Sequence, residues 1–147
     1  MLYHASGEVV EFPEVRKSKY TKDFSWGFYC TNNFEQAKRN REHATVNYYT
    51  YRENKNLNIL KFEKMTDEWL DFIAACRKGN IHDYDIVEGP MADDTVWNYV
   101  NDFLAGEITR SIFWELAKFK YPTHQISFHT LKALDCLKFE RSEIINE

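Results

Sequence analysis

The chain has 147 residues, of which 44% are hydrophobic and 16% are aromatic. This apolar content can fill the core of one domain of ordinary size and is too high for a disordered chain, so we expect a single domain over residues 1–147. The formal net charge of −4 at pH 7 disfavours proteins whose affinity comes from the phosphate backbone of a nucleic acid, because that mode needs a concentrated basic surface.

The cysteine and apolar patterns bear on where the protein acts. Cys30, Cys76 and Cys136 lie far apart and form no CxxC pair, which favours free thiols in a reducing compartment. The N-terminus lacks the basic start and apolar run of a secretion signal, and no apolar stretch reaches the ~18–20 residues needed to cross a bilayer. We therefore expect a cytoplasmic protein with no membrane partner and no metal site.

Up to residue 62 the sequence predicts four strands and one helix. Apolar and aromatic runs bounded by turn residues predict strands at "MLYHAS" (1–6), "GFYCT" (27–31), "VNYYTY" (46–51) and "LNILKF" (57–62). Residues 7–22 contain a proline and several charges and predict a long irregular connection. The helix is predicted at "NNFEQAKRNREHA" (32–44), where Asn32 is the N-cap and Glu35 completes a capping box.

Beyond residue 62 helices predominate, and the clearest is "TDEWLDFIAACRKGN" (66–80). Thr66 caps this helix, Gly79 ends it, and an i, i+3, i+4, i+7 stripe forms its apolar face, made of Trp69, Phe72, Ile73 and Cys76. The other predicted elements are a strand at "YDIVEGP" (84–90), helices at "DDTVWNYVNDFLAG" (93–106) and "TRSIFWELAKFK" (109–120), a strand at "QISFHT" (125–130), and "LKALDCLKF" (131–139), which begins as a helical turn and ends extended.

The order of these elements mixes strands and helices without the regular alternation of a doubly wound sheet. An α+β domain with a largely antiparallel or split sheet fits this order best.

Three groups of polar residues could carry chemistry, and each has an ordinary explanation. On a strand, Gln125, Ser127 and His129 share one face, for which a solvated outer face is the default. Asp93 and Asp94 stand at a predicted helix start, where carboxylates cap backbone N–H groups. The remaining candidates, His43 and His82, lie in polar surroundings and are expected on the surface.

Five motifs, taken in order, resemble one bacterial family. They are "LYHAS", "DFSWGFYCTNNFEQA", "ILKFEKMTDEWLDFI", "YDIVEGPMADD" and "HQISFHTLKALDCLKF", similar to the family patterns YHGS, DFGxGFYxT followed by EQA, YDxVxGPxADD, and QxxFHT. That family was long catalogued as a domain of unknown function and resembles ADP-ribosyltransferases. Through it the chain is similar to their histidine–tyrosine–glutamate branch, which includes diphtheria toxin and the poly-ADP-ribose polymerases.

The resemblance implies a split β-sandwich whose central cleft holds NAD. It implies that His4 hydrogen-bonds a ribose hydroxyl, that the backbone of Ala5 pairs with the nicotinamide carboxamide, and that Tyr29 stacks on the nicotinamide ring. Gln125 falls where the branch commonly has its glutamate, and Ser6 is expected beside the same ligand.

Further expectations concern the backbone and the acceptor. Gly27 is expected to let the backbone approach the ligand closely. The resemblance leaves open which group activates the acceptor; Asp93 is the first choice, with Asp94 and His129 as alternatives, and helix capping is an equally good explanation of Asp93.

The activity implied by the resemblance is NAD-dependent transfer of ADP-ribose to a macromolecular acceptor with release of nicotinamide. A protein acceptor is favoured over nucleic acid by the sequence pI of about 5.8, and a small antitoxin partner is expected on resemblance alone. Ala5 replaces the glycine of the YHGS pattern, and Gln125, which matches the pattern QxxFHT, replaces the glutamate of the wider branch and cannot act as a base. Two alternatives therefore stay open: a non-catalytic nucleotide- or partner-binding domain, and an NAD glycohydrolase.

Overall fold

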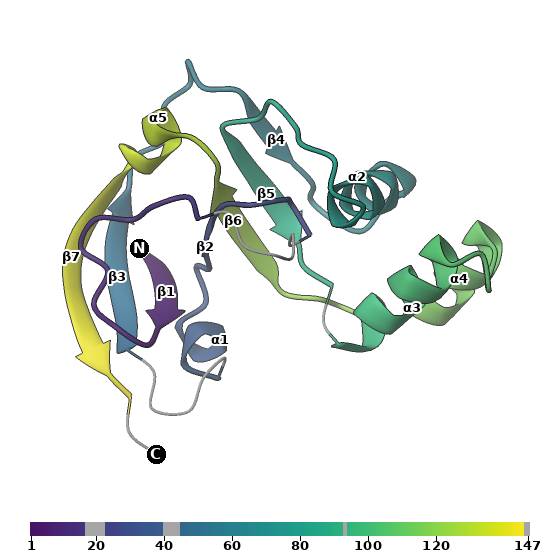
Figure 1. Cartoon of the computed structure of the whole chain (residues 1–147). Coiled ribbons are helices and arrows are strands. Elements are labelled where there is room, and N and C mark those ends of the chain that lie inside the picture. Colours follow the sequence, from purple (N-terminus) through teal and green to yellow (C-terminus); the bar gives the residue numbers. More distant parts are fainter. Residues whose placement is uncertain (17–22, 40–44, 93, 146–147) are drawn as a thin grey trace.

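The computed structural model describes residues 1–16, 23–39, 45–92 and 94–145. These residues form two sheets (Figure 1). The three-stranded sheet has the order β1 (Leu2–Ser6), β3 (Thr45–Tyr51) and β7 (Leu137–Ile144); the four-stranded sheet has the order β2 (Phe28–Cys30), β6 (His124–Phe128), β5 (Ile86–Pro90) and β4 (Ile59–Lys61). All pairs are antiparallel except β4 with β5. The mixed, largely antiparallel architecture expected from the sequence is confirmed.

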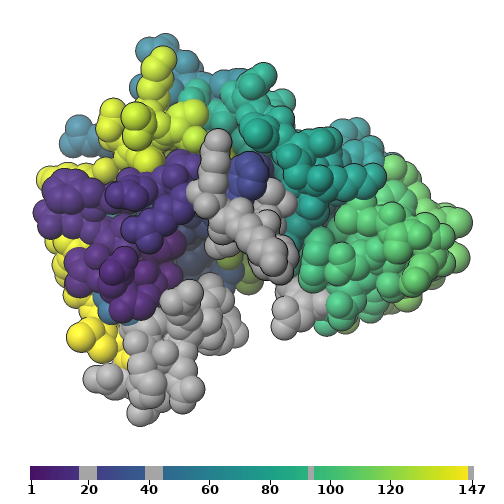
Figure 2. Space-filling view, viewed as in Figure 1, coloured from purple at the N-terminus to yellow at the C-terminus, as the bar shows by residue number. Residues whose placement is uncertain are grey.

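The helices of the described residues are α1 (Phe34–Arg39), α2 (Asp67–Arg77), α3 (Asp94–Leu104), α4 (Arg110–Ala117) and α5 (Leu131–Leu134). Figures 1 and 2 show α3 and α4 at one end of the molecule and the three-stranded sheet at the other. Within the described ranges, no helix has the length and apolar character needed to cross a lipid bilayer.

The two sheets meet through one isolated bridge between Tyr3, on β1, and Thr31, just after β2. The N–H of each residue donates to the carbonyl oxygen of the other, at 2.8 and 2.9 Å. One apolar cluster fills the space behind this junction, with Phe28, Tyr49 and Phe128 among its members. The bridge therefore fixes β1 against β2, although the two strands belong to different sheets.

A second apolar cluster lies between the four-stranded sheet and helices α2, α3 and α4. It includes the fully buried side chains of Trp69, Val87, Val100 and Phe113. The expected Thr66 cap on α2 is confirmed, because its side chain accepts from the N–H of Trp69. The helix ends as expected before Gly79, which has a φ of 99°.

Two expectations about local structure were wrong. The N-cap of α1 is Asn33, whose Oδ1 accepts from the N–H of Gln36 at 3.2 Å, and not Asn32. The other concerns β6, which is covered on both faces because it is an inner strand packed between the two clusters: Ser127, Ile126 and Phe128 are all buried. The two strands expected on either side of the turn at 52–56 are confirmed, and they lie in different sheets.

The connection after β1 has neither helix nor strand over residues 7–16, while its residues 17–22 lie outside the described part. Asn47 holds its first turn against β1. The fully buried Asn47 amide accepts from the N–H of Val10 at 2.9 Å and donates to the carbonyl oxygens of His4 and Glu8. A buried amide with all these partners stabilises one conformation of the turn.

We expect Trp69→Phe to lower the free energy of unfolding by about 2–3 kcal/mol. The indole N–H of Trp69 donates to the carbonyl oxygen of Pro90 at 2.8 Å. The substitution therefore leaves this buried carbonyl oxygen without a donor and creates a cavity. The matched control is Trp114→Phe, because the Trp114 indole donates to Asp67, which is exposed and which water can reach instead. Urea unfolding measures both, and equal losses in the two variants would contradict this account.

Candidate functional site

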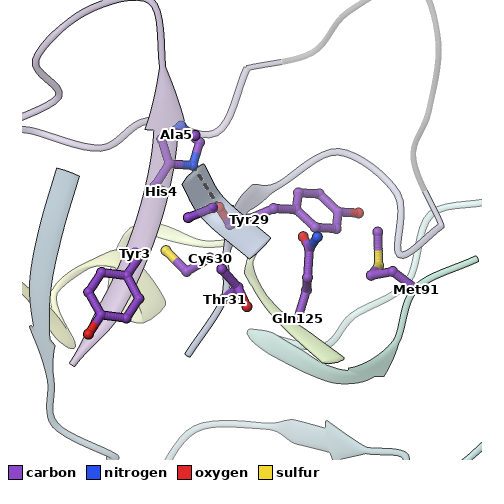
Figure 3. Close-up of a pocket in the computed structure, with 9 residues that line it drawn as sticks. Tyr3, His4, Ala5, Tyr29, Cys30, Thr31, Met91 and Gln125 are labelled. Carbon is purple, nitrogen blue, oxygen red and sulfur yellow. Dashed lines mark hydrogen bonds between the residues drawn. The ribbon is translucent and has the colours of Figure 1, made fainter. Parts of the chain in front are cut away.

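A pocket of about 190 Å³ opens at the junction of the two sheets (Figure 3). Its described lining comes from β1, from β2 and the residue after it, from α1, from the segment after β5, and from β6: Tyr3, His4, Ala5, Tyr29, Cys30, Thr31, Ala37, Met91 and Gln125. Four residues that the resemblance assigned to NAD binding, His4, Ala5, Tyr29 and Gln125, therefore line one pocket although they lie far apart in the sequence.

His4 is held in one orientation from two sides. Its Nδ1 lies 2.6 Å from the carbonyl oxygen of Tyr29, and its ring stacks on Phe28 with centroids 4.1 Å apart. A carbonyl oxygen can only accept, so Nδ1 carries a proton, and in the neutral imidazole Nε2 is then the nitrogen with the lone pair. This tautomer makes Nε2 of His4 a hydrogen-bond acceptor.

Tyr29 lines the pocket and is also part of the core. Its side chain is 6% exposed, and its ring stacks against Phe24. The hydroxyl donates to the carbonyl oxygen of Ser25 at 2.6 Å and accepts from the N–H of Phe24 at 3.1 Å. Burial raises the pKa of Tyr29, so the hydroxyl stays protonated and acts as a fixed link. Little of the ring face is therefore accessible to a ligand in this conformation.

Gln125 and Ala5 bring an amide and a backbone segment to the same pocket. Gln125 is half-buried near the start of β6, opposite Gly89 in the ladder, and Figure 3 shows its amide pointing toward the Tyr29 ring. Ala5 lies in β1, and among the described non-glycine residues only Ser25 has a positive φ. An alanine at position 5 is therefore unstrained, although the family pattern has a glycine there.

Two other residues expected at the ligand do not line this pocket. Ser6 ends β1, and its hydroxyl accepts from the N–H of Glu8. Gly27 lies against His129: a Cβ added at Gly27 would come within 2.7 Å of His129 Nδ1 and 3.1 Å of the carbonyl oxygen of Phe128. The glycine at this position makes room for an imidazole of the protein itself, which differs from the expected close approach to a ligand.

Of the candidates for activating an acceptor, His129 is the one whose side chain the structure describes. Asp93, the first choice, lies outside the described residues, and Asp94 is the first residue of α3. His129 does not line this pocket. Its Nδ1 lies 2.7 Å from the carbonyl oxygen of Trp26, and its Nε2 lies 2.6 Å from Ser127 Oγ. Both nitrogens of His129 are therefore occupied by structural partners.

The segment from Asp23 to Gly27 is linked to the pocket through Tyr29, whose hydroxyl it binds. Four of its residues are held by groups from other parts of the chain: Asp23 by Arg77, Phe24 by His82, Ser25 by the Tyr29 hydroxyl and Trp26 by His129. Ser25 is buried with a φ of 76°, which is uncommon for serine and persists where surrounding contacts impose it. The sequence indicated this segment only as part of the motif "DFSWGFYCTNNFEQA".

Comparison with known protein families matches residues 1–139 to the family described as "Protein of unknown function (DUF3990)". The chain belongs to this family. No curated protein and no solved structure gave a match. In this member of the family, the matched range includes every described residue that lines the pocket.

A pair of histidines holds the 23–27 segment in this family member. His82 and His129 meet edge to face with centroids 4.4 Å apart, and burial lowers the pKa of both. His82, expected on the surface, is half-buried, with Nε2 2.8 Å from the carbonyl oxygen of Phe24. The expectation for His43 falls outside the described residues. Among the described residues, no group of three or more His, Cys, Asp or Glu side chains is arranged to hold a metal ion.

Protonation of His129 should destabilise the fold at acidic pH. Burial lowers the pKa of His129 from 6.5 to about 4. Between these two values the unfolded chain binds a proton at His129 that the folded protein does not. The stability that neutral His129 contributes is therefore complete above pH 6.5 and is lost as the pH falls toward 4. The expected loss is about 3 kcal/mol. Urea unfolding across this range measures it.

The control compares two substitutions of histidine by glutamine. His129→Gln should flatten the pH profile of the unfolding free energy between pH 6.5 and 4, while His124→Gln, at an exposed position on β6, should keep the wild-type slope. A His129→Gln profile as steep as that of the wild type would show that other groups cause the acid loss.

Proposed function

We propose that this protein is an NAD-dependent ADP-ribosyltransferase with an ADP-ribosyltransferase-like split β-sandwich fold. It would transfer ADP-ribose from NAD to a macromolecular acceptor, of which a protein is our first choice, and release nicotinamide. The observation that supports this most directly is the convergence of His4, Ala5, Tyr29 and Gln125 on one pocket, because motif resemblance assigns all four to NAD binding although they lie far apart in the sequence.

The chemistry of the lining suits the nicotinamide end of NAD. The pocket offers an imidazole with a lone pair at Nε2, a side-chain amide on Gln125 and the backbone of Ala5, which together can accept from hydroxyl groups and pair with a carboxamide. Its volume of about 190 Å³ lies below the roughly 300–1,000 Å³ of pockets that enclose drug-sized ligands. We therefore expect the nicotinamide and its ribose inside the pocket and the adenosine half outside it.

In the proposed reaction, the bond between ribose C1′ and the nicotinamide nitrogen breaks, and its electron pair stays on that nitrogen. A new bond forms between C1′ and the acceptor nucleophile, which gives up a proton to solvent or to a base. The contribution we assign to this chain is orientation and exclusion of water: His4 and Gln125 hold the ribose, and the nicotinamide, once it fills the pocket, leaves no room for bulk water beside the bond that breaks.

The cellular setting belongs to the same proposal. We expect the protein to act in the cytoplasm, and we expect a small antitoxin protein as its partner, by analogy with the families it resembles. The antitoxin would bind the folded protein and block access of NAD or of the acceptor.

The proposal is tested by incubating the purified protein with NAD and measuring nicotinamide release with and without cell lysate. Lysate-dependent release with labelling of a macromolecule is the expected result. Release without lysate would make the protein an NAD glycohydrolase, and binding without release would make it a non-catalytic nucleotide-binding domain. Neither release nor binding by calorimetry would overturn the proposal.

A single substitution tests the assignment of the pocket. Gln125→Ala should weaken NAD binding about tenfold, since one lost hydrogen bond to a ligand costs about 1.5 kcal/mol. Calorimetry measures the change in affinity. His124→Ala is the matched control, because His124 is the exposed neighbour on the same strand and does not line the pocket. Unchanged affinity in Gln125→Ala would remove Gln125 from the binding site.

A further inference from the structure

Asp23 is a fully buried carboxylate that joins three separate parts of the chain. Its Oδ1 accepts from Nε and Nη2 of Arg77, on α2, at 2.8 and 2.5 Å. Its Oδ2 accepts from the backbone N–H of Ala92 at 2.7 Å. The side chain of Asp23 is 0% exposed, while that of Arg77 is 24% exposed. A buried carboxylate persists where charged and hydrogen-bonding partners satisfy it, as they do here.

Asp23 is linked to two residues that line the pocket, to Met91 through its Oδ2 and to Tyr29 through the backbone that follows it. Ala92 directly follows Met91, which lines the pocket. On the other side, Asp23 directly precedes Phe24 and Ser25, whose backbone N–H and carbonyl groups hold the Tyr29 hydroxyl. One side chain therefore connects the backbone that carries Met91 with the backbone that fixes Tyr29.

A second contact, with Trp97, fixes the position of the Arg77 guanidinium that binds Asp23. Its guanidinium carbon lies 3.8 Å from the centroid of the Trp97 ring, on α3. A planar guanidinium stacked on an indole and bound to a carboxylate through two N–H groups has little rotational freedom. The position of Asp23 is thus set by α2 and α3 together.

We propose that Asp23 is a positioning residue of the pocket, which sets the separation of the Met91 and Tyr29 walls and so controls the affinity for NAD. The claim about NAD affinity rests on the proposed function, whereas the claim about the separation of Met91 and Tyr29 does not. Asp23 touches no ligand in this scheme, since it acts through the Ala92 backbone on one side and through the Phe24–Ser25 backbone on the other.

The chemistry of the side chain suggests a sharp test. A carboxylate accepts with both oxygens, whereas an amide accepts with one oxygen and presents an NH₂ donor on the other side. In Asp23→Asn, either Arg77 or the Ala92 N–H must therefore face a donor. The matched control is Asp71→Asn, because Asp71, on α2, also pairs with an arginine, Arg110 on α4, but is exposed.

Two measurements without NAD test the structural part. In Asp23→Asn, hydrogen exchange of the Ala92 amide should become at least tenfold faster, while the Tyr3 amide, which is bonded to Thr31, should keep its rate. The methyl resonance of Met91 should shift as its position relative to the Tyr29 ring changes. Asp71→Asn should alter neither. An unchanged Ala92 exchange rate together with an unchanged Met91 resonance would overturn the proposal.

The functional part is measured by calorimetry and by the kinetics of nicotinamide release, well below the unfolding temperature of each variant. Asp23→Asn should raise the Kd and the KM for NAD about tenfold with a smaller change in kcat, and Asp71→Asn should match the wild type. If the wild type binds NAD and Asp23→Asn binds it equally well, the positioning role is wrong although the proposed function stands.

Two further outcomes are also decisive. If the wild type neither binds nor cleaves NAD, the proposed function fails, and the exchange and methyl data alone decide whether Asp23 sets the pocket walls. If Asp23→Asn does not fold, Arg77→Lys replaces it: the charge is kept but the paired N–H donors to Oδ1 are lost. The same changes should then appear with smaller size, and their absence in a folded Arg77→Lys would overturn the proposal.

Discussion

The pair of backbone hydrogen bonds between Tyr3 and Thr31 joins the two sheets, and the pocket depends on them. Each strand is otherwise committed elsewhere, β1 to β3 and β2 to β6. Where they meet, the residue after Tyr3 is His4, whose imidazole then reaches the carbonyl oxygen of Tyr29. The pocket is the space left where two sheets touch along one bridge and not along a full ladder.

Most of the polar groups around this junction are buried, and their hydrogen bonds restrict the conformation of the backbone there. The Asp23 carboxylate and the Asn47 amide each join backbone segments distant in sequence, and the Tyr29 hydroxyl holds the nearby backbone of Phe24 and Ser25. Buried polar groups of this kind are costly unless every partner is present, so each of them favours one arrangement of the chain around the pocket. The strained backbone at Ser25 is consistent with a segment whose conformation is imposed by its neighbours.

Local signals predicted most of the elements, and packing determined the rest. The α2 helix followed from Thr66, its apolar stripe and Gly79, all of which act within a few residues of one another. The polar face of β6 was misjudged because alternation cannot tell a solvated face from a second buried one. Whether Ser127 is exposed depends on helices and strands that pack on β6 from elsewhere in the chain.

The pocket was predictable only in part. Motif resemblance pointed to residues of β1, β2 and β6, and the structure brings His4, Ala5, Tyr29 and Gln125 together. Asp23 and His82 could not be recognised, because their importance lies in partners such as Arg77 and the Phe24 carbonyl group that are distant in sequence. The conformational freedom of Gly27 led to the expectation that a ligand lies close to its backbone. The His129 ring fills that space in the structure.

The strand order has a consequence for synthesis of the chain. Phe28 pairs with Phe128, and β3 pairs with β7 at the end of the described chain, so neither sheet can be completed while the last strands are still inside the ribosome. Contacts of such long range form late in folding. The pocket should therefore form only after β6, which carries Gln125, has left the ribosome.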